Sequence, residues 1–121
     1  MQINLETADQ HAIQSYSESG VKINNVTYEN SLIVGKQSLI TPWLIRTIQE
    51  LDVSNLDDLL KFNPEIIIIG HNQLGAWAPM AVIQHLSKLR IGIECMSIGA
   101  ASRTFNVLLS EQRTVVMGLI L

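Results

Sequence analysis

The chain has 121 residues, of which 47% are apolar, which suits one hydrophobic core but leaves too little chain for two independent ones. We therefore expect a single domain over residues 1–121. The net charge of −3 argues against a nucleic-acid binder, because proteins of that class usually present a basic face.

The beginning of the chain lacks the pattern of a signal peptide, which opens on a basic stretch followed by an apolar run. Glu6 and Asp9 follow a mixed opening instead. No stretch approaches the roughly 20 consecutive apolar residues that a membrane-spanning helix needs. We therefore expect a cytoplasmic protein without direct membrane insertion.

The N-terminal third of the chain predicts β structure. Residues 13–18 alternate as on a strand of mixed exposure, and Ser31–Val34 predicts a further strand that Gly35 closes. Between them, residues 21–28 form two short alternating runs around Asn24-Asn25. Asparagine tolerates the left-handed backbone of tight turns, so this pattern predicts a β-hairpin.

Residues 41–51 permit two interpretations. Thr41 could cap a helix whose first residue is Pro42 and whose apolar residues recur at helical spacing. Trp43 and Ile45 instead alternate with their neighbours as they would on a strand. The residues alone leave both interpretations open.

Ser54 begins a pattern similar to a capping box, in which its side chain would accept a hydrogen bond from the backbone of Asp57. The helix that follows ends near Phe62, before Pro64. Asp57 and Asp58 lie in its first turn, where acidic side chains complement the helix dipole. We therefore interpret them as surface acids rather than as a catalytic pair.

A strand–helix–strand unit follows. Ile66–Ile69 is a β-branched run ended by Gly70, as expected for a central strand that is covered on both faces. A helix begins at Pro79 and continues to about Arg90, and Ile93–Met96 is the next strand. This order predicts a βαβ unit with two parallel strands and a right-handed crossover.

A second helix and a last strand complete the predicted fold. Gly99 leads into a helix that reaches about Leu109, and Val115–Leu121 predicts the final strand. Cys95 lies within an apolar run and has no identifiable base near it, so we interpret it as a small buried side chain.

A polar segment after the predicted central strand is the first candidate binding site. It contains Gly70, His71, Asn72 and Gly75, and open α/β sheets place their ligands at this edge. The imidazole of His71 titrates near neutrality and would suit a general base or an anion ligand. The segment matches neither glycine motif for nucleotides, so an ordinary strand-to-helix connection is the alternative.

The start of the last helix is the second candidate, with Arg103, Thr104 and Asn106. Arg103 could bind a carboxylate or phosphate through two parallel hydrogen bonds. Alternatively, Arg103 pairs with Glu94 or Glu111, and Asn106 holds a loop. Because the two preceding strands are predicted to be parallel, both candidate segments would lie at one end of the sheet.

Trp77 is a candidate interface residue, because a half-exposed tryptophan in a loop can anchor a partner protein. The alternative is that it folds over its own core. The chain offers no recognisable catalytic triad and no metal-ligand spacing, so we predict no catalytic residues, no metal and no cofactor.

The stretch Pro64–Gly70 resembles a known protein family, and the similarity strengthens at Gly92–Met96 and Ala100–Leu108. It ends with Glu111-Gln112-Arg113 and the last strand. On these motifs the chain resembles, over residues 12–120, a small domain of unknown function. The mitochondrial members of that family are the assembly factor three proteins of respiratory complex I.

The resemblance implies a three-layer α/β fold with a central mixed sheet, helices and an added N-terminal β-hairpin layer. It also favours a strand at Trp43–Ile45 over a helix. Two motifs depart from the family, which usually has Gly-Thr-Gly in place of Gly70-His71-Asn72 and Glu-Gly-Arg in place of Glu111-Gln112-Arg113. The second departure implies a slightly different turn before the last strand.

The resemblance supplies no catalytic mechanism and implies an assembly role through protein contacts. We therefore expect a non-enzymatic binding or assembly module whose partner is an unknown protein, by resemblance a respiratory or other membrane-complex component. The alternative is a small-molecule or anion site, which could be enzymatic, between the Gly70–Gly75 loop and the Arg103 helix. The hydrophobic composition also allows a homo-oligomer.

Overall fold

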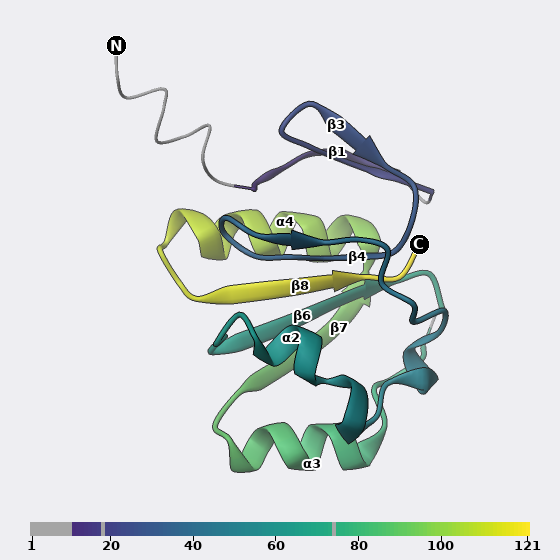
Figure 1. The fold of residues 1–121 in the computed structure, drawn as a ribbon, viewed down its shortest axis with the longest axis vertical. Coiled ribbons are helices and arrows are strands. Elements are labelled where there is room, and N and C mark those ends of the chain that lie inside the picture. Colours follow the sequence, from purple (N-terminus) through teal and green to yellow (C-terminus); the bar gives the residue numbers. More distant parts are fainter. Residues whose placement is uncertain (1–10, 18, 74) are drawn as a thin grey trace.

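The computed structural model describes residues 11–17, 19–73 and 75–121, whose strands form two sheets. A five-stranded mixed sheet, in the order β5-β4-β8-β6-β7, forms the centre of the domain (Figure 1). Its strands are β4 (Leu32–Val34), β5 (Leu39–Ile40), β6 (Ile66–His71), β7 (Gly92–Ser97) and β8 (Val115–Leu119). The second sheet is antiparallel and consists of β1 (Ile13–Tyr16), β2 (Val21–Ile23) and β3 (Val26–Tyr28).

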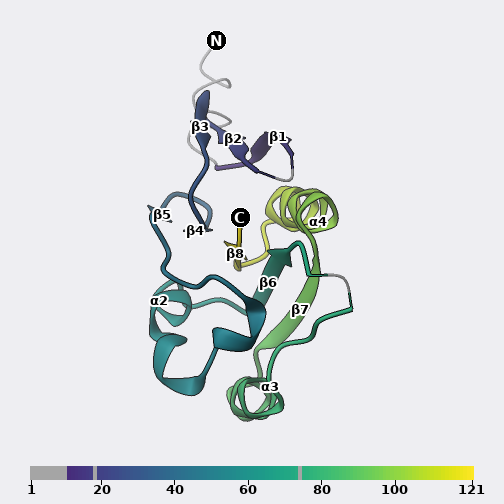
Figure 2. The ribbon, with the colours of Figure 1, turned by 90° about the vertical axis from the view of Figure 1, so that its right-hand side faces the viewer.

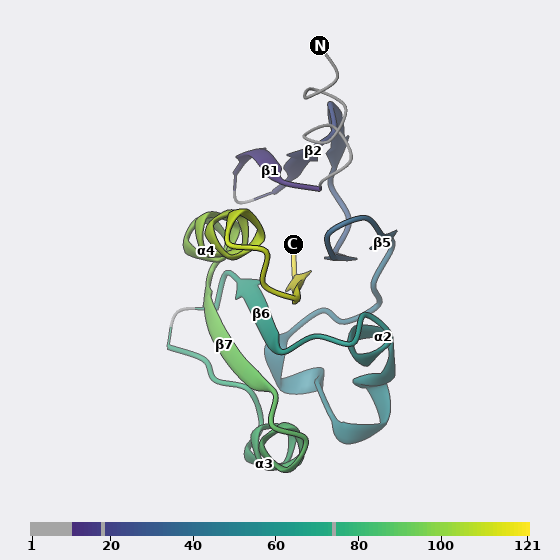
Figure 3. The ribbon, with the colours of Figure 1, turned by 90° about the vertical axis from the view of Figure 1, so that its left-hand side faces the viewer.

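Helices cover both faces of the central sheet. Helix α4 (Ile98–Ser110) lies between the central sheet and the three-stranded sheet, whereas α2 (Asp57–Leu60) and α3 (Met80–Lys88) cover the opposite face (Figures 2 and 3). Two single-turn 3-10 helices, η1 (Ile48–Glu50) and η2 (Val53–Asn55), precede α2. These layers confirm the predicted α/β class with a central mixed sheet, helices and an added N-terminal β layer. None of the helices in the described ranges is long and apolar enough to cross a membrane.

The predicted βαβ unit is confirmed. β6 pairs in parallel with β7 on one side and with β8 on the other, and α3 connects β6 to β7. The side chains of β6 alternate between two cores, since Ile67 and Ile69 pack on the α3 face and Ile66 and Ile68 on the α4 face. A strand covered on both faces explains why its sequence is a continuous apolar run.

The predicted hairpin is also confirmed. β2 and β3 pair in antiparallel register, with Val21 opposite Tyr28 and Ile23 opposite Val26. Both turn residues, Asn24-Asn25, have positive φ, at 51° and 67°. The left-handed conformation that favours asparagine is therefore the one this turn adopts.

The predicted strand at Trp43–Ile45 is wrong, and so is the helix that was its alternative. The backbone N–H of Trp43 donates to the carbonyl of Ser31 at 2.7 Å, but no ladder follows within the described residues. Trp43 and Ile45 are 6% and 8% exposed, whereas Leu44 is 83% exposed. An extended chain buries alternate side chains whether or not it pairs, so the pattern imitates a strand.

The capping box lies two residues before the predicted one. The carboxylate of Asp52 accepts from the backbone N–H of Asn55 at 2.9 Å, and the side chain of Asn55 accepts from the N–H of Asp52 at 2.9 Å. Ser54 instead donates its hydroxyl to Asp52 at 2.6 Å. Aspartate and serine cap helices equally well, so the sequence pattern does not distinguish them.

The last strand and one edge of the central sheet also differ from the prediction. The last strand ends at Leu119 rather than at Leu121, and Leu39–Ile40 forms a short edge strand that was not predicted. Two residues are too few to establish an alternating pattern, and their pairing with β4 becomes visible only in the assembled sheet.

Candidate functional site

An open cavity of about 490 Å³ lies at the carboxyl ends of β6 and β7. The parallel register places His71 opposite Ser97, so the residues that follow both strands meet at one edge of the sheet. The connection from β6 to α3 runs beside β7 in both side views (Figures 2 and 3). The residues that line the cavity are His71, Asn72, Gln73, Gly75, Ala76, Trp77, Cys95, Met96 and Ser97.

His71 is the last residue of β6 rather than a loop residue, and it is 6% exposed. Its Nδ1 accepts a hydrogen bond from the backbone N–H of Gln73 at 3.0 Å. Burial lowers the pKa of this imidazole, so the ring is neutral at pH 7 and carries its proton on Nε2. The ring is therefore suited to donate one hydrogen bond, while its basic nitrogen is already occupied.

Gln73 holds the wall of the cavity against a distant segment. Its side-chain oxygen accepts from the backbone N–H of Ile48 at 2.9 Å, and its amide nitrogen donates to the side chain of Gln49 at 3.1 Å. Because these partners lie about 25 positions earlier in the chain, the sequence offers no signal for this role. Gln73 was therefore missed among the predicted site residues.

The remaining walls combine an exposed aromatic side chain with two small polar groups. Trp77 is 77% exposed. The thiol of Cys95 is half-buried, and burial raises its pKa, so it is protonated at pH 7 and poorly suited to act as a nucleophile. The hydroxyl of Ser97 accepts from the backbone N–H of Ala100 at 3.2 Å and caps α4.

The residues that line this cavity include no Lys, Arg, Asp or Glu within the described chain. The described residues therefore give this cavity neither a pair of carboxylates for acid–base chemistry nor a cation that would hold an anion. Across residues 11–17, 19–73 and 75–121, no group of three or more His, Cys, Asp or Glu could hold a metal ion. The walls of the cavity beside Trp77 suit a neutral polar group or an apolar side chain of a ligand.

The second predicted segment does not line this cavity. The guanidinium of Arg103 lies 2.5 Å from the hydroxyl of Tyr16 and 5.9 Å from the centre of its ring. No ion pair links Arg103 to Glu94 or Glu111 in the part of the chain that the structure describes. The polar head of Arg103 therefore contacts β1 rather than a neighbouring acid.

Asn106 and Thr104 also make contacts within the fold. The side chain of Asn106 accepts from the backbone N–H of Ile13 at 2.7 Å and donates to its carbonyl at 2.9 Å, which attaches β1 to α4. The hydroxyl of Thr104 lies 3.5 Å from the sulfur of Met96. Of the seven predicted ligand residues, the structure thus brings His71, Asn72 and Gly75 to the cavity, whereas Gly70, Arg103, Thr104 and Asn106 are not among the residues that line it.

Gly70 has a packing role at the same end of β6. A Cβ at this position would lie 2.6 Å from a methyl carbon of Leu119 and 2.8 Å from the Cβ of Ala101. The missing side chain therefore lets α4 approach the sheet. Gly75, in contrast, has open space around it and a φ of 76°, which favours glycine at that turn.

The family described as "Protein of unknown function (DUF498/DUF598)" matches residues 13–120. A protein from Francisella tularensis subsp. holarctica (strain LVS), named "13 kDa major membrane protein", is 35% identical over 71 residues. That stretch covers 59% of this chain and 58% of the relative, so the match spans little more than half of the relative's length.

Two solved structures have a similar fold over nearly the whole chain. A protein from Xanthomonas campestris, determined by NMR, has a TM-score of 0.83 and 29% identity, covering 99% of this chain and 92% of that one. A Mth938-like domain from Bordetella pertussis has a TM-score of 0.77 and 19% identity, covering 93% and 86%. These likenesses agree with the predicted small α/β domain of unknown function. None of these descriptions refers to respiratory complex I.

Proposed function

The chain belongs to the protein family of unknown function DUF498/DUF598, and from that premise we propose that it is a non-enzymatic binding module that acts through contacts with another protein. The observation that carries the proposal is the exposure of Trp77, of which 77% is accessible. The proposal includes an assembly role, which the resemblance to complex I assembly factors implies. It also includes a partner protein from a respiratory or other membrane complex, which the name of the Francisella relative supports.

Trp77 is accompanied by a second exposed apolar side chain. Met80, three residues later at the start of α3, is 65% exposed. Large apolar side chains that lie together on a surface mark contact sites more often than chance, and tryptophan is strongly enriched among residues that dominate binding energy. We call Trp77, Met80 and the outer edge of β7 the Trp77 surface.

The outer edge of β7 adds unpaired backbone groups to this surface. β7 is the last strand of the central sheet, and the N–H of Gly92 donates towards β6, to the carbonyl of Glu65 at 3.1 Å. Backbone groups alternate along a strand, so those of Ile93 and Cys95 point away from the sheet. No hydrogen bond among the described residues reaches them from outside the sheet. An extended partner segment could pair with this edge while it contacts Trp77.

Partner retrieval with matched variants tests the proposal. Immobilised protein is exposed to native cell extract, and the retained proteins are identified by mass spectrometry. Trp77→Ser should reduce the retention of a specific partner at least tenfold, which corresponds to about 1.4 kcal/mol. Leu44→Ser is the matched control, because Leu44 is 83% exposed and does not line the same cavity.

Equal retention by wild type and Trp77→Ser, or no specific partner at all, would contradict the proposal. With the partner in hand, hydrogen exchange supplies an independent check, because the outward amides of Ile93 and Cys95 should become protected on binding. Sedimentation of the purified protein shows whether the partner is a second copy of this chain or a different protein. Self-association that Trp77→Ser abolishes would make the module a homo-oligomer.

A second candidate function is the binding of a small neutral ligand in the cavity of about 490 Å³ beside Trp77. The specific observation is His71, whose Nδ1 is satisfied by Gln73 and whose Nε2–H remains a donor. A thermal-shift screen of small polar metabolites tests it, since ligands that bind the native state raise the melting temperature. A hit that survives His71→Ala would exclude this cavity as its site.

A further inference from the structure

A second cavity, of about 530 Å³, lies at the opposite end of the central sheet from the first. Its residues come from the turn between β4 and β5, from the end of α2, and from the segment that leads into β8. We propose that this cavity binds a phosphate-bearing molecule. The proposal is independent of the Trp77 surface, because the two cavities share no lining residue.

The charged residues that line this cavity within the described chain are all cations, Lys36, Lys61 and Arg113. Each comes from a different one of the three segments. The whole chain has only 8 Lys and Arg against 11 Asp and Glu, so three of its basic side chains meet at one cavity of an acidic protein. Cations converging from separate segments are the arrangement that recognises a multiply charged oxyanion.

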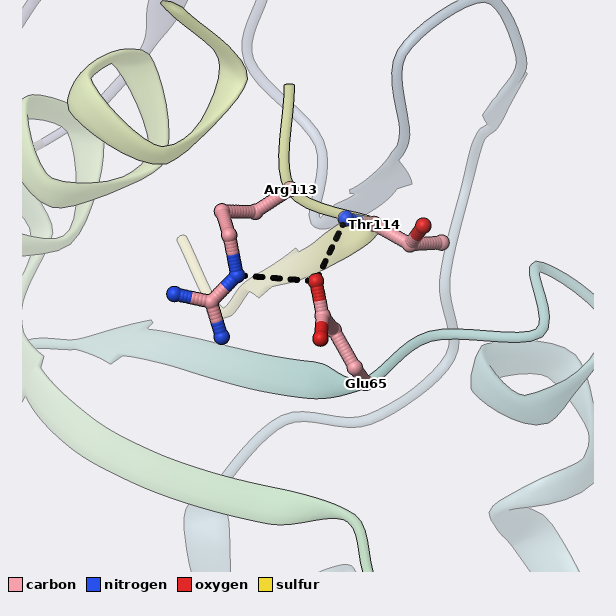
Figure 4. Close-up of polar contacts among 3 residues, drawn as sticks. All are labelled: Glu65, Arg113 and Thr114. Carbon is pink, nitrogen blue, oxygen red and sulfur yellow. Dashed lines mark hydrogen bonds and ion pairs between the residues drawn. The ribbon is translucent and has the colours of Figure 1, made fainter. Parts of the chain in front are cut away.

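Arg113 pairs with an acid outside the cavity lining, and both side chains of this pair are partly exposed. Its Nε donates to an oxygen of Glu65 at 2.8 Å, and the same oxygen accepts from the backbone N–H of Thr114 at 3.1 Å (Figure 4). Arg113 lowers the pKa of the Glu65 carboxyl, so this acid is ionised at neutral pH. Because Glu65 engages only Nε, the two terminal amino groups of Arg113 remain as a pair of donors for an oxyanion.

The two lysines are less constrained than Arg113. Lys61 pairs with Asp58 at 3.1 Å, but both side chains are largely exposed, so solvent weakens this pair. Lys36 makes no ion pair among the described residues. It lies in a turn closed by a hydrogen bond from the N–H of Gly35 to the carbonyl of Ser38, at 2.9 Å. Both ammonium groups can therefore reorient towards a bound anion.

Neutral side chains complete the cavity. Ser38, Gln112 and Thr114 add hydroxyl and amide donors, while Phe62 and Ile40 supply an apolar wall. Gln112 has a φ of 61°, the left-handed conformation in which glycine is more usual. This combination suits a phosphate attached to a small organic group, since the phosphate offers three acceptor oxygens to the cations and the organic group can contact Phe62.

Inorganic pyrophosphate is a suitable probe for the full chain, followed by amide chemical shifts in NMR. We expect shifts confined to residues near 36–38, 61–62 and 112–114. The double variant Lys36→Gln/Lys61→Gln should weaken binding at least tenfold. Lys88→Gln, which removes one lysine charge at the end of α3 and outside the cavity lining, should change the affinity less than twofold.

The variant Gln112→Gly shows whether the Gln112 side chain contacts the ligand or only stabilises the fold. It removes the amide and relieves the left-handed backbone, so it should weaken pyrophosphate binding several-fold while leaving the melting temperature unchanged or higher. The proposal is overturned if pyrophosphate shifts no cavity amide, or if Lys88→Gln weakens binding as much as the double variant.

The phosphate could belong to a soluble molecule or to a lipid headgroup. Co-sedimentation with vesicles of equal parts phosphatidylcholine and phosphatidic acid distinguishes the two sources. Sedimentation that the double variant abolishes and Lys88→Gln retains assigns the site to a lipid headgroup. Pyrophosphate binding without sedimentation assigns it to a soluble phosphate, and sedimentation that all variants share equally counts against the cavity.

Discussion

The segments that follow β6 and β7 both carry polar residues at the same edge of the sheet, yet they use them differently. After β7, the side chains of Arg103 and Asn106 bond to Tyr16 and Ile13 and hold the N-terminal sheet on α4. At the end of β6, His71 lies beside an open cavity, and Trp77 in the connection that follows projects into solvent. The two segments look equally suited to ligand binding in the sequence, but among the described residues it is the segment at the end of β6 whose predicted side chains line the cavity.

The difference shows that residue type and position do not by themselves identify a site. β1 is an edge strand of the three-stranded sheet, and backbone groups at a sheet edge still need hydrogen-bond partners. Asn106 supplies these partners for the N–H and the carbonyl of Ile13. A side chain committed in this way is not available to a ligand. Accounting for each hydrogen bond therefore separates structural polar residues from candidate functional ones, and stability measurements can test that separation.

The largest expected effect is at Gly70, where β6 meets α4. Gly70→Ala should lower the free energy of unfolding by about 3 kcal/mol, because the new Cβ would lie 2.8 Å from the Cβ of Ala101 and would displace the helix. Gly92→Ala is the matched control on the neighbouring strand, since a Cβ there meets nothing within 4 Å. Urea denaturation measures both, and equal losses would contradict the packing argument.

Asn106→Ala should have the next largest effect, a loss of about 2 kcal/mol, because it leaves the N–H and carbonyl of Ile13 without their partner. Arg103→Ala removes only a surface contact with Tyr16 and should lose less than about 1 kcal/mol. Hydrogen exchange should accelerate at β1 in the first variant. If the two variants prove equally mild, Asn106 does not attach β1 to α4.

A smaller effect should appear in the pH dependence of stability. The pKa of His71 is lowered by burial, so as pH falls below the unfolded value of about 6.5 the unfolded chain binds a proton that the native ring resists. The free energy of unfolding should therefore decrease between about pH 7 and pH 5. His71→Gln should make this dependence shallower, as urea titrations at several pH values would show. An unchanged slope would mean that the ring titrates normally in the native state.

The smallest effect on stability is expected at Trp77. Because its side chain is 77% exposed, Trp77→Ser should change the free energy of unfolding by less than about 0.5 kcal/mol. Thermal or urea denaturation tests this directly. A loss of more than about 2 kcal/mol would show that Trp77 folds over its own core, and would remove the observation on which the proposed protein contact rests.

Local patterns in the sequence were enough to predict several elements. Asn24-Asn25 predicted the hairpin, and the run Ile66–Ile69 predicted a strand covered on both faces. The same kind of pattern misled at Trp43–Ile45, where alternating burial occurs without strand pairing. It also misplaced the capping box, since Asp52 and Ser54 are both good caps and only geometry decides between them.

Gln112 shows how the assembled structure can require a backbone conformation that the residue type disfavours. The family resemblance implied a slightly different turn where glycine is replaced by Gln112, and that comparison stays a prediction. In this chain the residue adopts a φ of 61°, within the left-handed region that glycine favours. The backbone N–H of Arg113 donates to the carbonyl of Leu108, which ends α4 with a left-handed residue at position 112. The end of the helix therefore requires this backbone conformation even though the residue there is glutamine.

The features that depend on neighbours in the chain could be predicted from residue order: the α/β class, the parallel βαβ unit and the hairpin turn. Those features follow from the period of apolar residues and from backbone preferences, which act over a few positions. Which polar residues face a cavity depends instead on contacts between distant parts of the chain. The partners of Asn106, Gln73 and Arg113 lie 93, 25 and 48 positions away, and no local pattern encodes such distant contacts.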